Sequence, residues 1–201
     1  MIEPRDPIRA LTLLTRLPVP GGNGTRMAEA AWAWPLVGLV VGALQVAVGW
    51  AALAIGLPPG AAAGLALAAG ILTTGALHED GFADCADGFW GGYTRARRME
   101  ILKDSRIGAY GVLALILGVG LRWVLYAALL PVAPLAAIAA AMLSRAGMGV
   151  LMGWMPFARV GGLAAHVGRP PLGSVVLGGG LAIIGGALLI GSVGFAAAIA
   201  C

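Results

Sequence analysis

The chain has 201 residues, a formal net charge of +4 and a hydrophobic content of 60%. Only 11% of its residues are charged and its mean hydropathy is +0.92, values that exclude an ordinary soluble domain and indicate an integral membrane protein. We expect no nucleic-acid partner, and we expect function to reside in the loops and at the polar ends of helices.

The first 31 residues predict an interfacial segment and not a cleaved signal. Four arginines and three acidic residues lie here, and the apolar run LTLLTRLPVP is interrupted by Arg16 and two prolines. A short amphipathic helix on the membrane surface fits this pattern, with Ile8, Leu11 and Leu14 on its apolar face.

Five apolar segments are long enough to cross a bilayer as helices. They cover residues 32–56, 61–77, 107–130, 132–155 and 173–200. The second is short, and we expect its helix to continue into the acidic stretch that follows. The predicted fold class is all-α: a polytopic helical membrane protein forming one integral domain over 1–201, with about five transmembrane helices and an N-terminal interfacial helix.

Glycine and alanine are abundant along these segments, as in GLVVG (38–42). Small residues allow membrane helices to approach closely. A GC-rich genome would produce the same richness, so the composition alone leaves both interpretations open.

The basic residues predict the orientation in the membrane. Eleven of the 13 lysines and arginines lie in residues 1–31, 78–106 and 156–172, and none lies in the connections at 57–60 and 131–134. By the positive-inside rule the first three segments face the cytoplasm. We therefore expect a multi-pass protein of the cell inner membrane with segment 78–106 on the cytoplasmic side.

The stretch HEDGFADCADGFWGG (78–92) directly follows the second apolar segment. On a helix, Asp80, Asp84 and Asp87 would share one face over about 10 Å, and Asp104 returns near the start of the third span. Carboxylates at this density need a cation, and hard oxygen ligands suit Mg²⁺, with Mn²⁺ as an alternative. A solvated helix cap and a cation-transport site are the competing interpretations, although the position at a membrane edge weakens the second.

Basic residues crowd the same segment. Arginines that grip phosphate oxygens beside a carboxylate-bound metal are what metal-assisted transfer of a phosphate group requires. The same residues also obey the positive-inside rule, so both interpretations apply to them. They are Arg95, Arg97, Arg98, Lys103 and Arg106.

Two arginines fall inside predicted spans. Arg145 needs a polar cavity, an acidic partner or a substrate phosphate, because a charge within a membrane span is costly. Arg122 is expected to snorkel or to pack on a neighbour.

The acidic stretch together with MEILKDSRIGAYG (99–111) resembles the signature of the cobalamin 5'-phosphate synthase family, the adenosylcobinamide-GDP ribazoletransferases. The resemblance continues in order from about residue 8 to residue 165. Its further elements are LLTRLPVP (13–20), WPLVGLVVG (34–42), LSRAGM (143–148) and FARVGGLA (157–164). A looser similarity links the aspartate pattern to the CDP-alcohol phosphotransferases.

The resemblance implies an activity and its substrates. It implies Mg²⁺-dependent transfer of the phosphocobinamide group of adenosylcobinamide-GDP to α-ribazole or α-ribazole 5'-phosphate, with release of GMP, at the surface of the lipid bilayer. Another membrane phosphotransferase of the CDP-alcohol type and a carboxylate-based cation transporter remain as alternatives.

The resemblance also implies roles for individual residues. The implied metal ligands are Asp80, Asp84, Asp87 and Asp104. The implied catalytic residues are Asp87 or Asp104 as general base, and His78. The implied substrate-binding residues are Arg98, Lys103, Arg106, Arg145 and Arg159.

The sequence departs from the family pattern in three places. Cys85 stands where the family usually has Thr or Ser, and the loop AAHVGRPP (164–171) is unusual. After Cys201 the family usually continues with a Gly-Gly-x-Thr-Gly-Asp segment, and we expect this chain to lack it. Whether the protein forms a homo-oligomer is left open.

Overall fold

The computed structural model describes residues 2–20, 26–158 and 161–199, with side chains described up to Gly191. Every regular element in these ranges is a helix, which confirms the predicted all-α class. The helices are α1 Asp6–Leu14, η1 Glu29–Ala33, α2 Trp34–Ala54, α3 Pro59–Thr74, α4 Leu77–Gly91, α5 Arg95–Ile101, α6 Ala109–Leu129, α7 Pro134–Trp154, α8 Leu163–Val167 and α9 Leu172–Ile199.

The long helices occupy the predicted spans. Four of them are long and apolar enough to cross a membrane, and the bent pair α3 and α4 makes a fifth candidate. The prediction of about five transmembrane helices is therefore confirmed.

Proline lies in the first turn of α1, α2, α3 and α7, where its missing N–H costs nothing and its fixed φ favours the helix.

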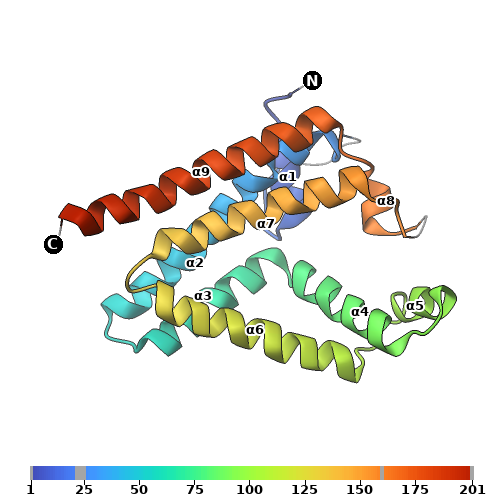
Figure 1. Cartoon of the computed structure of the whole chain (residues 1–201), viewed down its shortest axis with the longest axis horizontal. Coiled ribbons are helices and arrows are strands. Elements are labelled where there is room, and N and C mark those ends of the chain that lie inside the picture. The colour runs from blue at the N-terminus through green and yellow to red at the C-terminus, as the bar shows by residue number, and fades with distance from the viewer. Residues whose placement is uncertain (1, 21–25, 159–160, 200–201) are drawn as a thin grey trace.

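The helices form two groups that diverge toward one end of the molecule. Helices α2, α7 and α9 pack side by side, while α4 lies along α6, and in Figure 1 the two groups separate toward the right. The short helices α5 and α8 lie at that right-hand end, and the α2–α3 and α6–α7 turns lie at the left. The basic segments 78–106 and 156–172 thus extend toward the same end of the bundle.

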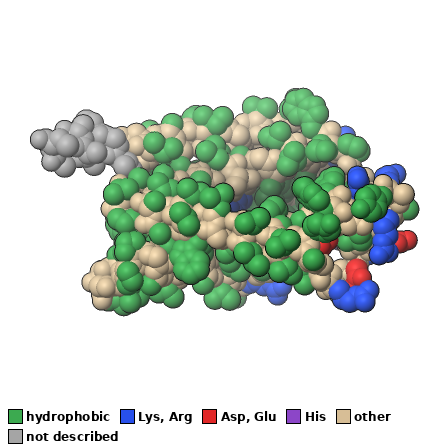
Figure 2. Space-filling view, turned by 60° about the horizontal axis from the view of Figure 1, so that its bottom comes forward, with side chains coloured by type: hydrophobic (Ala, Val, Ile, Leu, Met, Phe, Trp, Pro, Cys, Tyr) green, Lys and Arg blue, Asp and Glu red, His purple; other side chains and the backbone are tan. Residues whose placement is uncertain are grey.

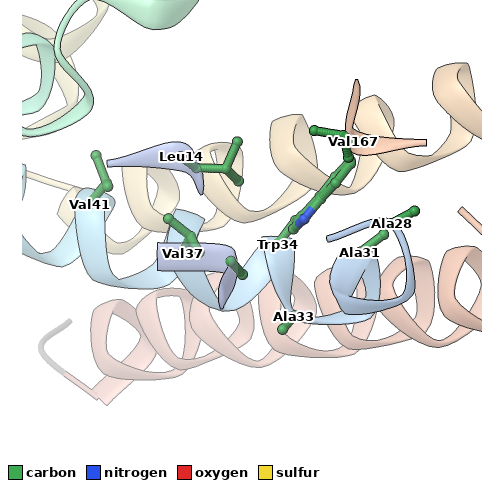
Figure 3. Packing of buried hydrophobic residues seen from close by; sticks show 9 residues of the cluster. Leu14, Ala28, Ala31, Ala33, Trp34, Val37, Val41 and Val167 are labelled. Atoms are coloured by element: carbon green, nitrogen blue, oxygen red, sulfur yellow. The ribbon is translucent and has the colours of Figure 1, made fainter. Parts of the chain in front are cut away.

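A compact apolar core joins the N-terminal helix to the bundle. Trp34 is 1% exposed and packs among small and branched side chains from α1, α2 and the segment that includes α8 (Figure 3). The members of this core include Leu14, Ala28, Ala31, Ala33, Val37, Val41 and Val167.

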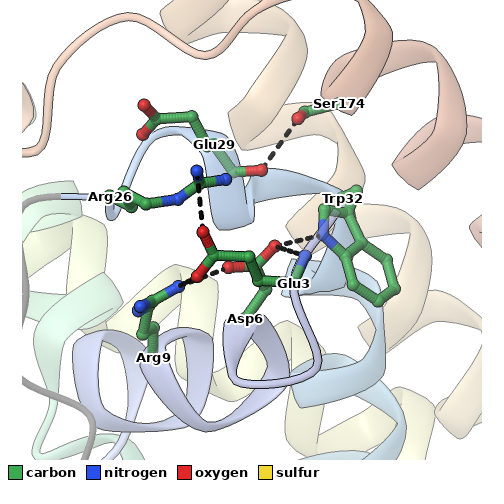
Figure 4. A network of polar contacts seen from close by, with 7 residues as sticks. All are labelled: Glu3, Asp6, Arg9, Arg26, Glu29, Trp32 and Ser174. Carbon is green, nitrogen blue, oxygen red and sulfur yellow. Dashed lines mark hydrogen bonds and ion pairs between the residues drawn. The ribbon is translucent and has the colours of Figure 1, made fainter. Parts of the chain in front are cut away.

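A polar network holds α1 against η1. Asp6 is fully buried and accepts hydrogen bonds from Trp32 Nε1 at 2.9 Å and from Arg9 at 2.8 Å (Figure 4). Glu3 pairs with Arg9 at 2.7 Å and with Arg26 at 2.8 Å. The predicted amphipathic helix is therefore present and is fixed to the bundle by both apolar and ionic contacts.

The second span does not continue straight into the acidic stretch, which corrects the sequence-based expectation. Gly75 and Ala76 both adopt left-handed conformations, with φ of 64° and 58°, and such residues end an α-helix. The chain turns by 89° before α4 begins. The N–H of Arg16 donates to the Thr73 carbonyl at 2.7 Å, and the Arg16 side chain packs against Gly75, so the N-terminal segment stabilises the bend.

Candidate functional site

The three aspartates of the acidic stretch lie on one helix. Helix α4 contains Asp80, Asp84 and Asp87, and their spacing of four and three residues puts them on one stripe, as predicted. Asp80 is exposed, Asp84 is half-buried and Asp87 is only 8% exposed. The stripe therefore passes from solvent into the contact between α4 and α6.

Asp87 binds the beginning of α6. Its carboxylate accepts the backbone N–H of Gly108 at 2.7 Å and that of Gly111 at 2.8 Å. The first N–H groups of a helix have no partner within the helix, and a carboxylate there also meets the positive end of the helix dipole. Asp87 thus caps α6 from a neighbouring helix.

Two glycines make room for this cap. A Cβ on Gly108 would lie 2.8 Å from the Asp87 carboxyl carbon, and one on Gly111 would lie 3.1 Å from it, with carboxylate oxygens closer still. Sequence reasoning did not identify this role. The signal is the G-x-x-G spacing of Gly108 and Gly111 at the start of an apolar helix.

We expect Gly111→Ala to destabilise the protein because it displaces the buried Asp87 carboxylate. The loss of charge-assisted hydrogen bonds should cost about 2 kcal/mol, or a fall in melting temperature of roughly 5 °C. The measurement is thermal unfolding of the purified protein in detergent, followed by circular dichroism. Gly120→Ala on the same helix is the matched control, since nothing lies within 4 Å of its Cβ position. Equal melting temperatures for the two variants would rule out the cap.

Asp104 is held by Arg106 just before α6. The Arg106 guanidinium donates to both carboxylate oxygens, at 2.7 Å and 3.1 Å, and the pair is exposed. These hydrogen bonds lower the pKa of Asp104 to about 2. Asp104 was predicted as a metal ligand or general base, and Arg106 as a substrate contact. In this structure the two side chains instead pair with each other.

The four predicted metal ligands do not gather at one point. Among the described residues, no three His, Cys, Asp or Glu side chains lie close enough together to hold a metal ion. Asp80 and Asp84 remain as a pair on one helical stripe. Mg²⁺ is commonly bound through one or two carboxylates with substrate phosphates and water completing its shell. The donor set therefore fits a metal shared with a substrate and does not fit an all-protein cage.

The basic helix α5 follows the end of the acidic stripe. Arg98 donates to the Gly92 carbonyl at 2.8 Å and lies 5.4 Å from the centre of the Phe89 ring, so it braces the turn between α4 and α5. Arg97 pairs with Glu100 at 2.9 Å. Lys103 is exposed just after α5, and Arg159 lies outside the described residues.

A cavity with a mainly apolar wall and several polar side chains opens within the bundle, between the two diverging helix groups. Its volume is about 490 Å³ and helices α2, α3, α4, α6 and α7 line it. Figure 2 shows a hollow in a largely apolar face whose charged side chains gather at the right-hand end, with basic side-chain atoms inside the hollow. The polar side chains that line the cavity are Gln45, Thr74, His78, Glu79, Arg122, Tyr126, Ser144 and Arg145.

Hydrogen bonds connect some of these polar groups across the cavity. Arg122 and Glu79 form an ion pair at 2.7 Å, a specific partner that the expectation of snorkelling or of packing on a neighbour did not name. Tyr126 donates to Gln45 at 3.0 Å. Glu79 points away from the aspartate stripe and into this site, and sequence reasoning missed its pairing because its partner is 43 residues away.

Other polar atoms of the cavity are unpaired. His78 Nε2, Glu79 Oε2 and Arg145 Nε are buried and have no hydrogen-bond partner among the described protein atoms. Arg145 donates to the neighbouring Ser144 hydroxyl at 2.9 Å. The structure therefore places His78 and Arg145 together at the cavity, whose lining includes none of the three aspartates of the stripe.

The fold and the site define a polytopic α-helical membrane protein with a carboxylate-bearing helix at one end of its bundle. The sequence model of the family described as cobalamin-5-phosphate synthase matches residues 6–201, and the chain belongs to this family.

Several curated relatives carry the name adenosylcobinamide-GDP ribazoletransferase. The protein of Bradyrhizobium diazoefficiens is 48% identical over 174 residues, which are 84% of this chain and 66% of the relative. That of Mesorhizobium japonicum is 43% identical over 96% of this chain and 76% of the relative. That of Azorhizobium caulinodans is 46% identical over 80% and 65%. The chain thus spans 65% to 76% of the length of these relatives, and no solved structure matches it.

Proposed function

We propose that the protein transfers the phosphocobinamide group of adenosylcobinamide-GDP to α-ribazole or α-ribazole 5'-phosphate and releases GMP. The observation that carries this proposal is the match of the cobalamin-5-phosphate synthase family over residues 6–201. The names of the relatives agree with it. The geometry of α4, α5 and the start of α6 supplies the chemical groups that such a transfer requires.

In the proposed reaction an acceptor hydroxyl attacks the phosphorus that carries cobinamide. A bond forms between that oxygen and phosphorus, the bond from phosphorus to the bridging pyrophosphate oxygen breaks, and GMP leaves with the negative charge. Asp80 and Asp84 would hold Mg²⁺, which when bound neutralises the pyrophosphate charge. The basic residues beyond α4, Lys103 and Arg106 among them, would bind phosphate oxygens.

The acceptor hydroxyl must also lose a proton. The Asp87 carboxylate is occupied by two backbone N–H groups of α6. Arg106 holds the pKa of Asp104 at about 2, so Asp104 is a weak base while the two residues are paired. If Arg106 turns to a substrate phosphate, Asp104 loses its partner and its pKa rises toward the ordinary value of 3.8. We therefore assign the base role to Asp104 in the substrate complex.

The proposed location is the cell inner membrane, with the acidic helix on the cytoplasmic side. The basic segments reach the same end of the bundle as α5 and α8 (Figure 1), and basic segments are retained in the cytoplasm. Both proposed substrates would then reach α4 from that side.

The direct test is a nucleotide-release assay on membranes that contain the full chain. We expect GMP to appear when adenosylcobinamide-GDP and α-ribazole 5'-phosphate are both supplied with Mg²⁺, and to stop when EDTA removes the metal. Omission of the acceptor and membranes without the chain are the controls. GMP release no greater than that of chain-free membranes would contradict the proposed reaction.

A further inference from the structure

We propose that the cavity between α2, α3, α6 and α7 binds a phosphate monoester carried on an apolar group, with Arg145 as its anion-binding residue. The inference deepens the proposed function and rests on it for one of its two candidate ligands, α-ribazole 5'-phosphate. The other source of the same chemistry is a phosphatidate molecule of the surrounding bilayer.

The charge balance of the cavity favours an anion. Arg122 and Arg145 bring two positive charges, and Glu79 is the one carboxylate among the described lining residues. Glu79 forms its ion pair with Arg122, so one carboxylate faces two guanidinium groups and the described lining keeps an excess positive charge. A metal cation would meet two guanidinium groups and is disfavoured.

Arg145 is poorly satisfied by the protein itself. It lies in α7, in the apolar bundle, and its buried Nε has no hydrogen-bond partner among the described atoms. Its side-chain partner in the structure is the Ser144 hydroxyl, which carries no charge. Since a buried guanidinium is costly without a counter-charge and binds phosphate through several N–H groups at once, a bound phosphate would satisfy it.

The other lining residues indicate which chemical groups the ligand carries besides its phosphate. Apolar side chains form most of the wall, among them Val41, Leu67, Ile71, Leu125, Leu129 and Met148. The volume of about 490 Å³ is that of a site for a small organic molecule. His78 Nε2 and Glu79 Oε2 are buried without partners and could meet hydroxyl groups on the ligand. An apolar ring or chain with a phosphate and hydroxyls fits all of these features.

The test measures ligand binding by the purified full chain in nanodiscs, independently of turnover. The ligands are α-ribazole 5'-phosphate, unphosphorylated α-ribazole and short-chain phosphatidate. We expect the wild-type protein to bind at least one phosphorylated ligand, and Arg145→Gln to weaken that binding by roughly tenfold or more because a charge-assisted contact is lost. The affinity for unphosphorylated α-ribazole should be the same in both proteins.

Two further variants control for folding and for general charge. Arg145→Lys keeps the charge and should retain most of the binding. Arg169→Gln removes an exposed arginine outside the cavity, whose side chain donates to the Met155 carbonyl at 3.4 Å, and it should bind as the wild type does. If Arg145→Gln does not fold, the wild type and Arg145→Lys are compared instead. Binding of phosphorylated but not of unphosphorylated ligand by both proteins supports the site, and equal binding of the two ligands contradicts it.

Each outcome has a defined meaning. Arg145-dependent binding that α-ribazole 5'-phosphate competes for identifies the acceptor, and Arg145-dependent binding restricted to phosphatidate identifies a lipid; both support the site. Failure of both phosphorylated ligands to bind, or equal binding of them by the wild type and Arg145→Gln, overturns it. GMP release is measured separately. If binding depends on Arg145 but no GMP is released, only the proposed reaction is contradicted. If GMP is released but binding does not depend on Arg145, only the cavity site is contradicted.

Discussion

Replacing Asp84 with asparagine is expected to reduce GMP release on the order of 1,000-fold, since loss of even an outer-shell partner of a metal costs roughly 10- to 100-fold. Asp84 stands at the centre of the α4 stripe, between the exposed Asp80 and the buried Asp87. Asparagine keeps the size of the side chain and removes the negative charge that the proposed Mg²⁺ site requires. The measurement is the rate of GMP release in saturating Mg²⁺ and both substrates.

A second readout separates metal binding from turnover. Mn²⁺ binding to the purified protein, followed by electron paramagnetic resonance with substrate present, should weaken in Asp84→Asn. Glu100→Gln is the matched control, because Glu100 is an exposed acid on α5 that pairs with Arg97 and lies outside the stripe. An Asp84→Asn protein that binds Mn²⁺ and releases GMP at nearly the wild-type rate would falsify the metal role of this residue.

Gly38→Ala is expected to cause the largest loss of stability in the protein. A Cβ at Gly38 would lie 2.7 Å from the carbonyl carbon of Ala141 and 2.8 Å from the Cα of Met142, with the Ala141 oxygen closer still. These are backbone atoms of α7, which cannot rotate away, so α2 and α7 must separate along their contact. Overpacking of this kind costs about 3 kcal/mol, or a fall in melting temperature of roughly 10 °C.

The control for this substitution lies on the partner helix. Gly147 is also within α7, and nothing lies within 4 Å of its Cβ position, so Gly147→Ala should leave the melting temperature unchanged or raise it slightly. The measurement is the fraction of detergent-extracted protein that remains monodisperse after heating. Similar heat resistance of the two variants would show that the α2–α7 contact does not depend on Gly38.

The membrane spans could be predicted because hydrophobic length is a local property. The segments at 32–56, 107–130 and 132–155 became α2, α6 and α7 with ends within a few residues. The bend after α3 could not be predicted in the same way. Its left-handed residues sit in an apolar run, and the Arg16 contacts that stabilise them come from a segment far away in the sequence.

In the candidate site, too, local features could be predicted from the sequence and tertiary contacts could not. Helical spacing was enough to place Asp80, Asp84 and Asp87 on one stripe, but not to show that Asp87 is bound by the N–H groups of Gly108 and Gly111. These contacts depend on α4 lying beside α6, which is a tertiary feature.

The position of Glu79 on α4 could be predicted from helical geometry, but its ion pair could not. A rotation of about 100° per residue removes it from the stripe of Asp80, and it is not among the predicted metal ligands. The same rotation directs it to Arg122 on α6, a pairing that no local pattern contains.

The 89° turn between α3 and α4 also determines how much empty space the protein encloses. A straight helix through Thr74 and His78 would pack against its neighbours over its whole length, as close-packed interiors do. The turned pair instead forms an arch, and residues on both sides of its apex, Thr74 and His78 among them, border the same cavity. Two left-handed residues thus reduce the packing density and create interior volume, at a level of the bundle where polar side chains from α2, α3, α4, α6 and α7 meet.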